Sequence, residues 1–249
     1  MKTIEEKYHV NGKLMYRYEF NNGKFDGLSE EWYDNGKLYC RKNYKNDILD
    51  GIYEEYYVNG QIRFRYNYKN GHIDGLLEEW DYDGKLLTRR EFKDGKRDGV
   101  SETWHNNGQL RSRANYKNGV LEGLDEEWYS NGQILFRCNF KNNKRDGLFE
   151  SWYETGLLYA RTNYKNGKLN GVTEEYYENG QLKTRETNTN GELNGPFEDW
   201  DLAGLLRFRG NYKNGALDGP YEEWDENGTL VSRKIFKDGK LVTQDSTDC

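Results

Sequence analysis

The sequence is poor in the residues that build a thick apolar core and in those that cross-link a chain. Its 249 residues include three cysteines, three histidines and two prolines, and aliphatic residues are scarce. Cys40, Cys138 and Cys249 are too few and too scattered to form a disulfide framework. We interpret Cys40 and Cys138 as replacements of small or apolar strand residues. The histidines and cysteines do not cluster at metal-ligand spacing, so the sequence predicts no metal site.

Long apolar runs and a surplus of positive charge are also missing. No run of 18 apolar residues occurs, and the first ten residues, MKTIEEKYHV, lack the apolar centre of a signal peptide. We therefore expect a cytoplasmic protein if Met1 is the native start, and a surface or secreted protein if a leader was removed. The formal net charge is −6, with acidic and basic residues interleaved. This pattern argues against nucleic-acid binding and membrane binding, which draw on concentrated positive charge.

What the sequence has in abundance is repetition. The stretch Gly27–Asp50, GLSEEWYDNGKLYCRKNYKNDILD, returns 24 residues later as GIYEEYYVNGQIRFRYNYKNGHID. A fixed period of this length indicates a repeat array. We predict one continuous array over residues 3–241, followed by a polar tail over residues 242–249. The repeats open at Thr3, Gly27, Gly51, Gly75, Gly99, Gly123, Gly147, Gly171, Gly195 and Gly219.

Each repeat contains two turn signals and two strand signals. Asn35-Gly36 predicts a two-residue type I′ turn, and the run Lys45–Gly51 predicts a second turn. The segments between them are rich in Trp, Tyr and Phe, which suit a pleated, half-buried surface. The predicted fold class is therefore all-β: an elongated, single-layer antiparallel β-hairpin array of about ten 24-residue repeats, twisted as a ribbon, with no thick core.

A two-residue loop at Asn35-Gly36 would fix the register of each hairpin. It places Glu30 opposite Arg41, Trp32 opposite Tyr39 and Gly27 opposite Tyr44. A three-residue loop with a bulge would shift this pairing by one residue, and that alternative stays open. In the first register, one face of the sheet carries Leu28, Glu30, Trp32, Arg41 and Asn43, and the other carries Leu38, Cys40, Tyr44 and Leu49.

The positions of Glu30 and Arg41 hold Glu and Arg in all ten repeats. Facing opposite charges predict a cross-strand ion pair worth roughly 0.2–1 kcal/mol in each repeat. A ladder that holds the sheet together is one interpretation, and a polar recognition strip is the other. The glycine that opens each repeat lies opposite an aromatic residue, which would cover the bare backbone. Asn188 interrupts that aromatic column, so we expect the region Thr187–Pro196 to be the weakest part of the array.

The candidate binding residues are the aromatic column and one Glu–Arg pair on the same face. No repeat departs from the others by gaining a nucleophile, a base or a phosphate-binding loop, so we predict a protein that is not an enzyme and needs no cofactor. The candidate residues are Trp32, Tyr56, Trp80, Trp104, Trp128, Trp152, Tyr176, Trp200, Trp224, Glu102 and Arg113.

The run Glu30–Leu38 (E-E-W-Y-x-N-G-x-L) and the run Asn163–Gly171 (N-Y-K-N-G-x-L-N-G) resemble the MORN-variant repeats of bacterial proteins often labelled YwqK-family antitoxins. The resemblance extends from Ile4 to Leu241, and departs from the pattern in the repeats that open at Gly171 and Gly195. It implies a β-hairpin array used for protein interaction, and the antitoxin label implies a partner toxin. The family supplies no catalytic residue.

We therefore expect a non-enzymatic protein-protein interaction repeat protein, in one form an antitoxin or immunity protein that binds and occludes a toxin. Aromatic residues with polar surroundings are typical of such interfaces. The alternative is a glycan- or cell-wall-binding aromatic repeat protein, if the chain is exported. The expected partner is another protein, without nucleic acid or membrane insertion. Self-association, end to end or face to face, is a further expectation.

Overall fold

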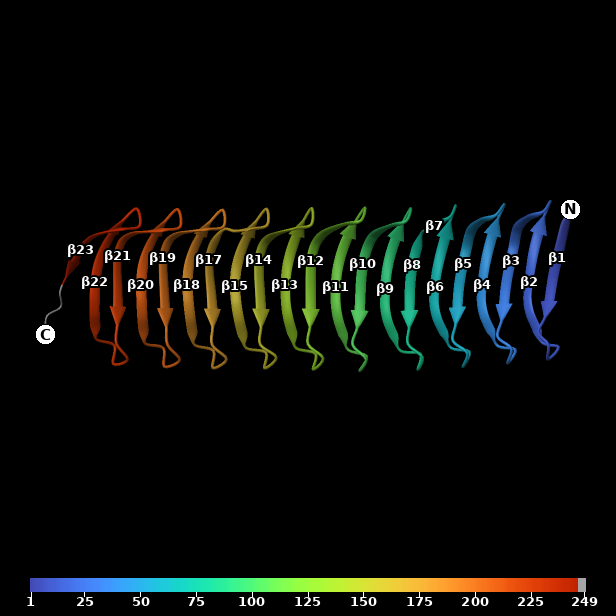
Figure 1. Cartoon of the computed structure of the whole chain (residues 1–249), viewed down its shortest axis with the longest axis horizontal. Coiled ribbons are helices and arrows are strands. Elements are labelled where there is room, and N and C mark those ends of the chain that lie inside the picture. Colours follow the sequence, from blue (N-terminus) through green and yellow to red (C-terminus); the bar gives the residue numbers. More distant parts are fainter. Residues whose placement is uncertain (246–249) are drawn as a thin grey trace. The chain divides into compact units, whose positions relative to one another are not determined.

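The structure is a computed structural model in which residues 1–245 are described. The described chain forms two compact parts, the first ending at Leu121 and the second beginning at Glu122. Within each part, antiparallel strands pair with their neighbours along the chain, and Figure 1 shows two kinds of turn at opposite edges of the sheet. Residues 1–245 contain no helix. The predicted all-β hairpin array is confirmed.

The structure has 23 strands, more than the two per repeat that the sequence predicts. Asp74 and Asn170 each interrupt a strand, and one strand follows the last complete hairpin. The first part holds β1 (Lys2–Tyr8), β2 (Leu14–Asn21), β3 (Lys24–Trp32), β4 (Leu38–Lys45), β5 (Ile48–Tyr56), β6 (Ile62–Lys69), β7 (His72–Ile73), β8 (Gly75–Trp80), β9 (Leu86–Lys93), β10 (Lys96–Trp104) and β11 (Leu110–Lys117). The division at Leu121/Glu122 falls in β12 (Val120–Trp128), and the second part continues with β13 (Ile134–Lys141), β14 (Lys144–Trp152), β15 (Leu158–Lys165), β16 (Lys168–Leu169), β17 (Gly171–Tyr176), β18 (Leu182–Thr189), β19 (Glu192–Trp200), β20 (Leu206–Lys213), β21 (Ala216–Trp224), β22 (Leu230–Lys237) and β23 (Lys240–Asp245).

The type I′ turn of each repeat lies at the second turn signal, and the first turn signal forms a longer loop. The two-residue type I′ turn lies at Asn46-Asp47, where φ is 50° and 68° and the flanking residues pair. The prediction of that turn at Asn35-Gly36 is wrong. Gly36 has a φ of 86° but Asn35 has no positive φ, and the Tyr33 N–H donates to the Lys37 carbonyl at 2.9 Å around a longer loop. The Asn35 Oδ1 accepts the Lys37 N–H at 2.9 Å, so the asparagine side chain stabilises this loop.

The predicted register is confirmed along most of each hairpin. Glu30 pairs with Arg41 and Gly27 with Tyr44, but Trp32 lies opposite Leu38 instead of Tyr39. A bulge between Glu31 and Trp32 absorbs the extra loop residue, so the longer loop leaves the rest of the pairing unchanged.

A second irregularity lies at the glycine that opens each repeat. Between β4 and β5 the register shifts between Lys42 and Tyr44, and Gly51 at this bulge has a φ of 117°. A Cβ at Gly51 would lie 3.0 Å from the Cβ of Asn43. Glycine is therefore required by the backbone conformation and by a close side chain, in addition to lying opposite an aromatic residue as predicted.

The two faces of the sheet differ in how far their residues repeat: one carries the same residue types in successive repeats and the other does not. The ladder face carries Glu30, Trp32, Arg41 and their equivalents, as predicted. The variable face carries Ser29, Cys40 and their equivalents, which change from repeat to repeat. Within residues 1–243, the buried apolar side chains are Cys40, Leu77, Cys138 and Ala160, all on the variable face. Both Cys40 and Cys138 are buried free thiols. The interpretation that Cys138 replaces a small or apolar residue is wrong, because other repeats have Lys42, Arg90 and Glu186 at its position.

The expected tail from Val242 starts inside a strand. Thr243 and Asp245 of β23 pair with Ile235 and Arg233 of β22, because the chain re-enters the sheet after the type I′ turn at Asp238-Gly239. Residues 246–249, including Cys249, lie outside the described residues.

Candidate functional site

Charged side chains on the ladder face pair both within a repeat and with the next repeat. The Arg41 Nη2 lies 2.9 Å from the Glu30 Oε1, and its Nη1 lies 3.8 Å from the Glu54 Oε2. The sequence-predicted pair Arg113 and Glu102 is formed as well, with the Arg113 Nε donating to the Glu102 Oε1 at 2.9 Å. The Glu–Arg column of the described residues therefore forms short groups of ion pairs, some of which join neighbouring repeats.

Glu150 is the most enclosed member of the described ladder. Its side chain is only 4% exposed, and its two oxygens lie 2.6 Å from Arg137 and 2.9 Å from Arg161. Desolvation would raise the pKa of Glu150, but the hydrogen bonds from the two arginines outweigh it and hold the pKa below its ordinary value. This carboxylate is held ionised by two cations.

The aromatic column lies against the arginines of the same face. The Arg137 guanidinium lies over the Trp152 ring at 5.4 Å, and Arg209 lies over Trp224 at 5.5 Å. Where tyrosine replaces tryptophan, its hydroxyl donates to the ladder instead, as Tyr56 does to the Glu54 Oε2 at 2.7 Å. All nine aromatic residues of the predicted site, Trp32, Tyr56, Trp80, Trp104, Trp128, Trp152, Tyr176, Trp200 and Trp224, are half-buried. The structure gives the column contacts inside the sheet, and contact with a partner remains a prediction.

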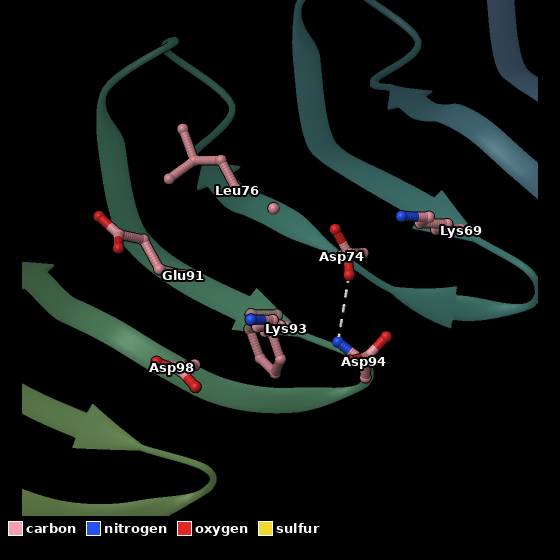
Figure 2. A pocket seen from close by; sticks show the side chains of 9 residues that line it. Lys69, Asp74, Leu76, Glu91, Lys93, Asp94 and Asp98 are labelled. Atoms are coloured by element: carbon pink, nitrogen blue, oxygen red, sulfur yellow. Dashed lines mark hydrogen bonds between the residues drawn. The ribbon is translucent and has the colours of Figure 1, made fainter.

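A hollow near the type I′ turns in the first part is a second candidate (Figure 2). It has a volume of about 550 Å³ and combines Lys69 and Lys93 with the carboxylates of Asp74, Glu91 and Asp98. The Asp74 Oδ2 accepts the backbone N–H of Asp94 at 3.2 Å, the bond drawn in Figure 2. The same bond joins other repeats, so we assign it to turn stabilisation. Among the described residues, no group of three His, Cys, Asp or Glu side chains is placed to hold a metal ion.

The variable face of the second part contains a third candidate, which we name the aromatic notch. It is an apolar hollow of about 470 Å³ near the loop edge, in repeats that open at Gly123 and Gly147. The Phe136 and Phe149 rings stack at 6.0 Å, and Tyr153 and Tyr159 meet edge to face at 5.1 Å. It is lined by Tyr129, Leu135, Phe136, Phe149, Ser151, Trp152, Tyr153 and Tyr159.

Sequence reasoning missed the notch, because it followed what the repeats share. The sequence signal was weak: Ser151 and Tyr159 stand at positions where the repeat opening at Gly51 has Glu55 and Arg63, but other repeats also lack the cation, as at Tyr39 and Leu135. In that repeat the Arg63 Nη1 and the Glu55 Oε1 form an ion pair at 2.8 Å.

The described residues contain no helix long and apolar enough to cross a membrane.

Comparison with known proteins identifies the repeats. Seven segments of the chain, which together make up more than half of it, match the family described as MORN repeat variant: residues 25–46, 49–70, 97–118, 121–142, 145–166, 169–187 and 217–244. The chain belongs to the MORN repeat variant family. Members of this family are generally non-enzymatic, and MORN repeats indicate a repeat protein that acts by interaction with a protein or a membrane.

The MORN repeat match is interrupted in two places within the array, and one of them follows the departure at Asn188. One match ends at residue 187, next to Asn188, and the segments around residues 73–94 and 193–214 are not matched. The search of curated proteins found no match. A crystal structure of TcdB2-TccC3 is 11% identical, aligned over 94% of this chain and 16% of that chain with a TM-score of 0.22. The chain thus spans about a sixth of that protein, and so low a TM-score supports no conclusion.

Proposed function

We propose that this MORN repeat protein is a non-enzymatic binding protein that captures another protein on its variable face. The observation that supports this most is the difference between the two faces: charged groups on the ladder face bond to one another, whereas the residues of the variable face change from repeat to repeat. On the ladder face, carboxylates such as Glu150 are already bonded to arginines, and the guanidiniums stack on tryptophans. Carboxylates and guanidiniums that already bond to one another have fewer free hydrogen-bonding positions for a partner protein.

The variable face differs from repeat to repeat. The position of Cys40 is held by Phe64, Thr88 and Phe136 in other repeats, on an otherwise constant hairpin. A constant frame that displays a changing surface suits recognition of one particular partner.

We further propose that the partner is a toxin whose active surface the array covers, as the resemblance to YwqK-family antitoxins implies. The test has two steps. The purified chain is used to capture proteins from lysate of its native cells, and the captured protein is co-expressed with the chain. We expect a protein that arrests growth when expressed alone and does not arrest growth with the chain present. A captured protein that is harmless alone would contradict the antitoxin role and leave protein binding intact.

A parallel binding assay against cell-wall polysaccharide decides the alternative. We expect no retention of the chain, because the Tyr129 and Tyr153 hydroxyls in the notch donate to backbone carbonyls at 2.9 and 2.7 Å and are not free for a sugar. Retention on polysaccharide, with no protein captured, would favour glycan binding.

A further inference from the structure

The aromatic notch lacks an ion pair that two other repeats of the described chain form on the same face. In the repeat opening at Gly51, the Arg63 guanidinium lies over Tyr57 at 5.7 Å and over Phe64 at 4.8 Å, and Glu55 holds it there. In the repeat opening at Gly171, Lys183 and Glu175 occupy the same positions, 3.7 Å apart.

In the repeat that opens at Gly147 neither charge is present, and in the repeat that opens at Gly123 the glutamate position holds Glu127 but Leu135 stands at the cation position beside Phe136. Ser151 replaces the glutamate and is buried, and Tyr159 replaces the cation and is 40% exposed. Among the described residues no guanidinium lies over the Phe136 ring, whereas the Arg145 guanidinium lies over Phe149 at 4.8 Å, so the two rings line an apolar hollow with one cation beside it. The hydroxyls of Tyr129 and Tyr153 are engaged, so the rings of the notch offer apolar contact to a ligand.

Acidic side chains surround this opening. Glu127 pairs across the strands with Phe136 on one side, and Glu175 pairs with Ala160 on the other. Glu154 and Glu178 lie on the loops and are exposed. Within residues 1–245, Glu127, Glu154 and Glu178 form no ion pair within 4 Å.

The fields of these carboxylates reach the notch tyrosines. Desolvation raises the pKa of Tyr153, and Tyr159, Glu178 and Glu175 raise it further. Two cations lie nearby: Lys183 beside Glu175, and Arg145, whose guanidinium lies over Phe149 at 4.8 Å. Four carboxylates against two cations leave the rim negative, and the formal charge of the whole chain is also negative at −6.

We propose that the aromatic notch docks an apolar side chain of a protein partner, on a segment that carries lysine or arginine on both flanks. This rests on the proposed protein-binding function and names the chemistry of the partner. The apolar side chain fills the hollow, and the basic flanks meet Glu127 on one side and the loop carboxylates on the other. A negative rim disfavours an anionic lipid surface.

The test uses a closed variant of the full chain, Ser151→Glu with Tyr159→Arg, which introduces the pair found at Glu55 and Arg63. Short random peptides displayed on phage are selected on the wild-type chain after depletion on the closed variant. We expect enriched peptides with Phe, Leu, Ile or Met between basic residues. A synthetic peptide of that set should bind the wild-type chain about tenfold or more tightly than the closed variant, a difference of about 1.4 kcal/mol. Replacing its central apolar residue by Ala should cost a similar factor.

A charge-matched control, Asn106→Glu with Gln109→Arg, places the same two side chains on an exposed loop of the first part and should bind like the wild type. Equal thermal midpoints of the three proteins exclude misfolding. The proposal is overturned if no peptide is enriched, if enriched peptides have acidic flanks, or if they bind the closed variant equally well. The proposal is also overturned if the wild-type chain and the charge-matched control bind phosphatidylserine vesicles or oligosaccharides and the closed variant does not.

Lysate capture with both the wild-type chain and the closed variant distinguishes a failure of notch docking from a failure of protein binding. A partner retained by both proteins refutes docking at the notch and leaves the proposed function standing. No captured protein with either chain refutes the proposed function itself.

Discussion

The glutamates of the ladder share one sequence position but differ in their surroundings. The Glu150 side chain is 4% exposed between two arginines, whereas the Glu102 side chain is 16% exposed and bonded to Arg113. An enclosed carboxylate depends on its partners more than an accessible one, because water cannot replace them. Equal conservation along the repeats therefore hides unequal energetic roles.

We predict that Glu150→Gln costs about 2 kcal/mol of unfolding free energy and Glu102→Gln about 0.5–1 kcal/mol. Urea unfolding of both variants measures this. Since the folded pKa of Glu150 is lowered, its contribution is present above the ordinary glutamate pKa and is lost as the pH falls through the folded value. The gap between the variants should therefore narrow in acid. Equal costs at neutral pH would contradict the prediction.

Asp125 on the variable face should have the opposite pH dependence. Desolvation, then the Glu127 carboxylate, raises its pKa to about 6, although Arg145 opposes the shift. Because folding raises this pKa, the folded state favours protonated Asp125. The side chain therefore stabilises the fold fully below the unfolded pKa near 3.9, and this stabilisation is lost as the pH rises through about 6. Asp125→Asn should therefore stabilise the protein by about 1 kcal/mol at pH 7 and hardly at all at pH 3.5. Urea unfolding at both values checks this, and a gain that is independent of pH would refute the raised pKa.

At the scale of the element, the type I′ turn is stabilised from the preceding repeat. A carboxylate accepts the N–H of the first turn residue, as Asp146 does for Asn166 at 3.0 Å. Six turns of the described chain have this bond. Asn170 and Asn194 stand at the carboxylate position before two other turns, at Asn190 and Asn214. These two turns lack the acidic acceptor.

We predict that Asn194→Asp stabilises the chain by about 0.5–1 kcal/mol, because a charged acceptor strengthens the bond to the Asn214 N–H. The reverse change, Asp146→Asn, should lose a similar amount. Thermal unfolding of both variants makes a matched comparison. Identical midpoints for the two variants would show that the carboxylate does not support the turn.

The sequence predicted the hairpins, the two faces and the ladder, because each follows from alternation and from a fixed period. It could not separate the loop types at Asn35-Gly36, since an asparagine suits both a left-handed turn position and a side-chain bond to a backbone N–H. The bulge at Trp32 follows from that choice. The notch was beyond reach for another reason: Ser151 and Tyr159 acquire meaning only when β13, β14 and β15 lie side by side.

At the scale of the whole molecule, we expect cooperativity to be weakest around Asn188. This side chain is 4% exposed and donates to the Glu186 Oε1 at 2.8 Å, where most repeats have an aromatic ring. Amide hydrogen exchange should be faster in Thr187–Phe197 than in the matching stretch Asn139–Phe149, because nearest-neighbour contacts hold a repeat array together.

The variant Asn188→Tyr should slow this exchange and raise the unfolding free energy by about 0.5–1 kcal/mol. The same exchange measurement on Asn163→Ser, at a neighbouring exposed position of β15, provides the control. Equal protection of the two stretches in the wild type would show that the array has no weak point there.

Each hairpin sets its own register, through the bulge at its tryptophan and the glycine that opens it. Misalignment in one repeat is therefore not passed to the next, and every repeat presents the same glutamate and arginine to its neighbours. At the level of the gene, each repeat is therefore an exchangeable cassette. After an in-frame duplication or loss of one cassette, the two strands that meet at the new junction still present the same glutamate and arginine to each other. The length of such a gene can change in whole steps during replication, and new cassettes are free to diverge on the variable face alone.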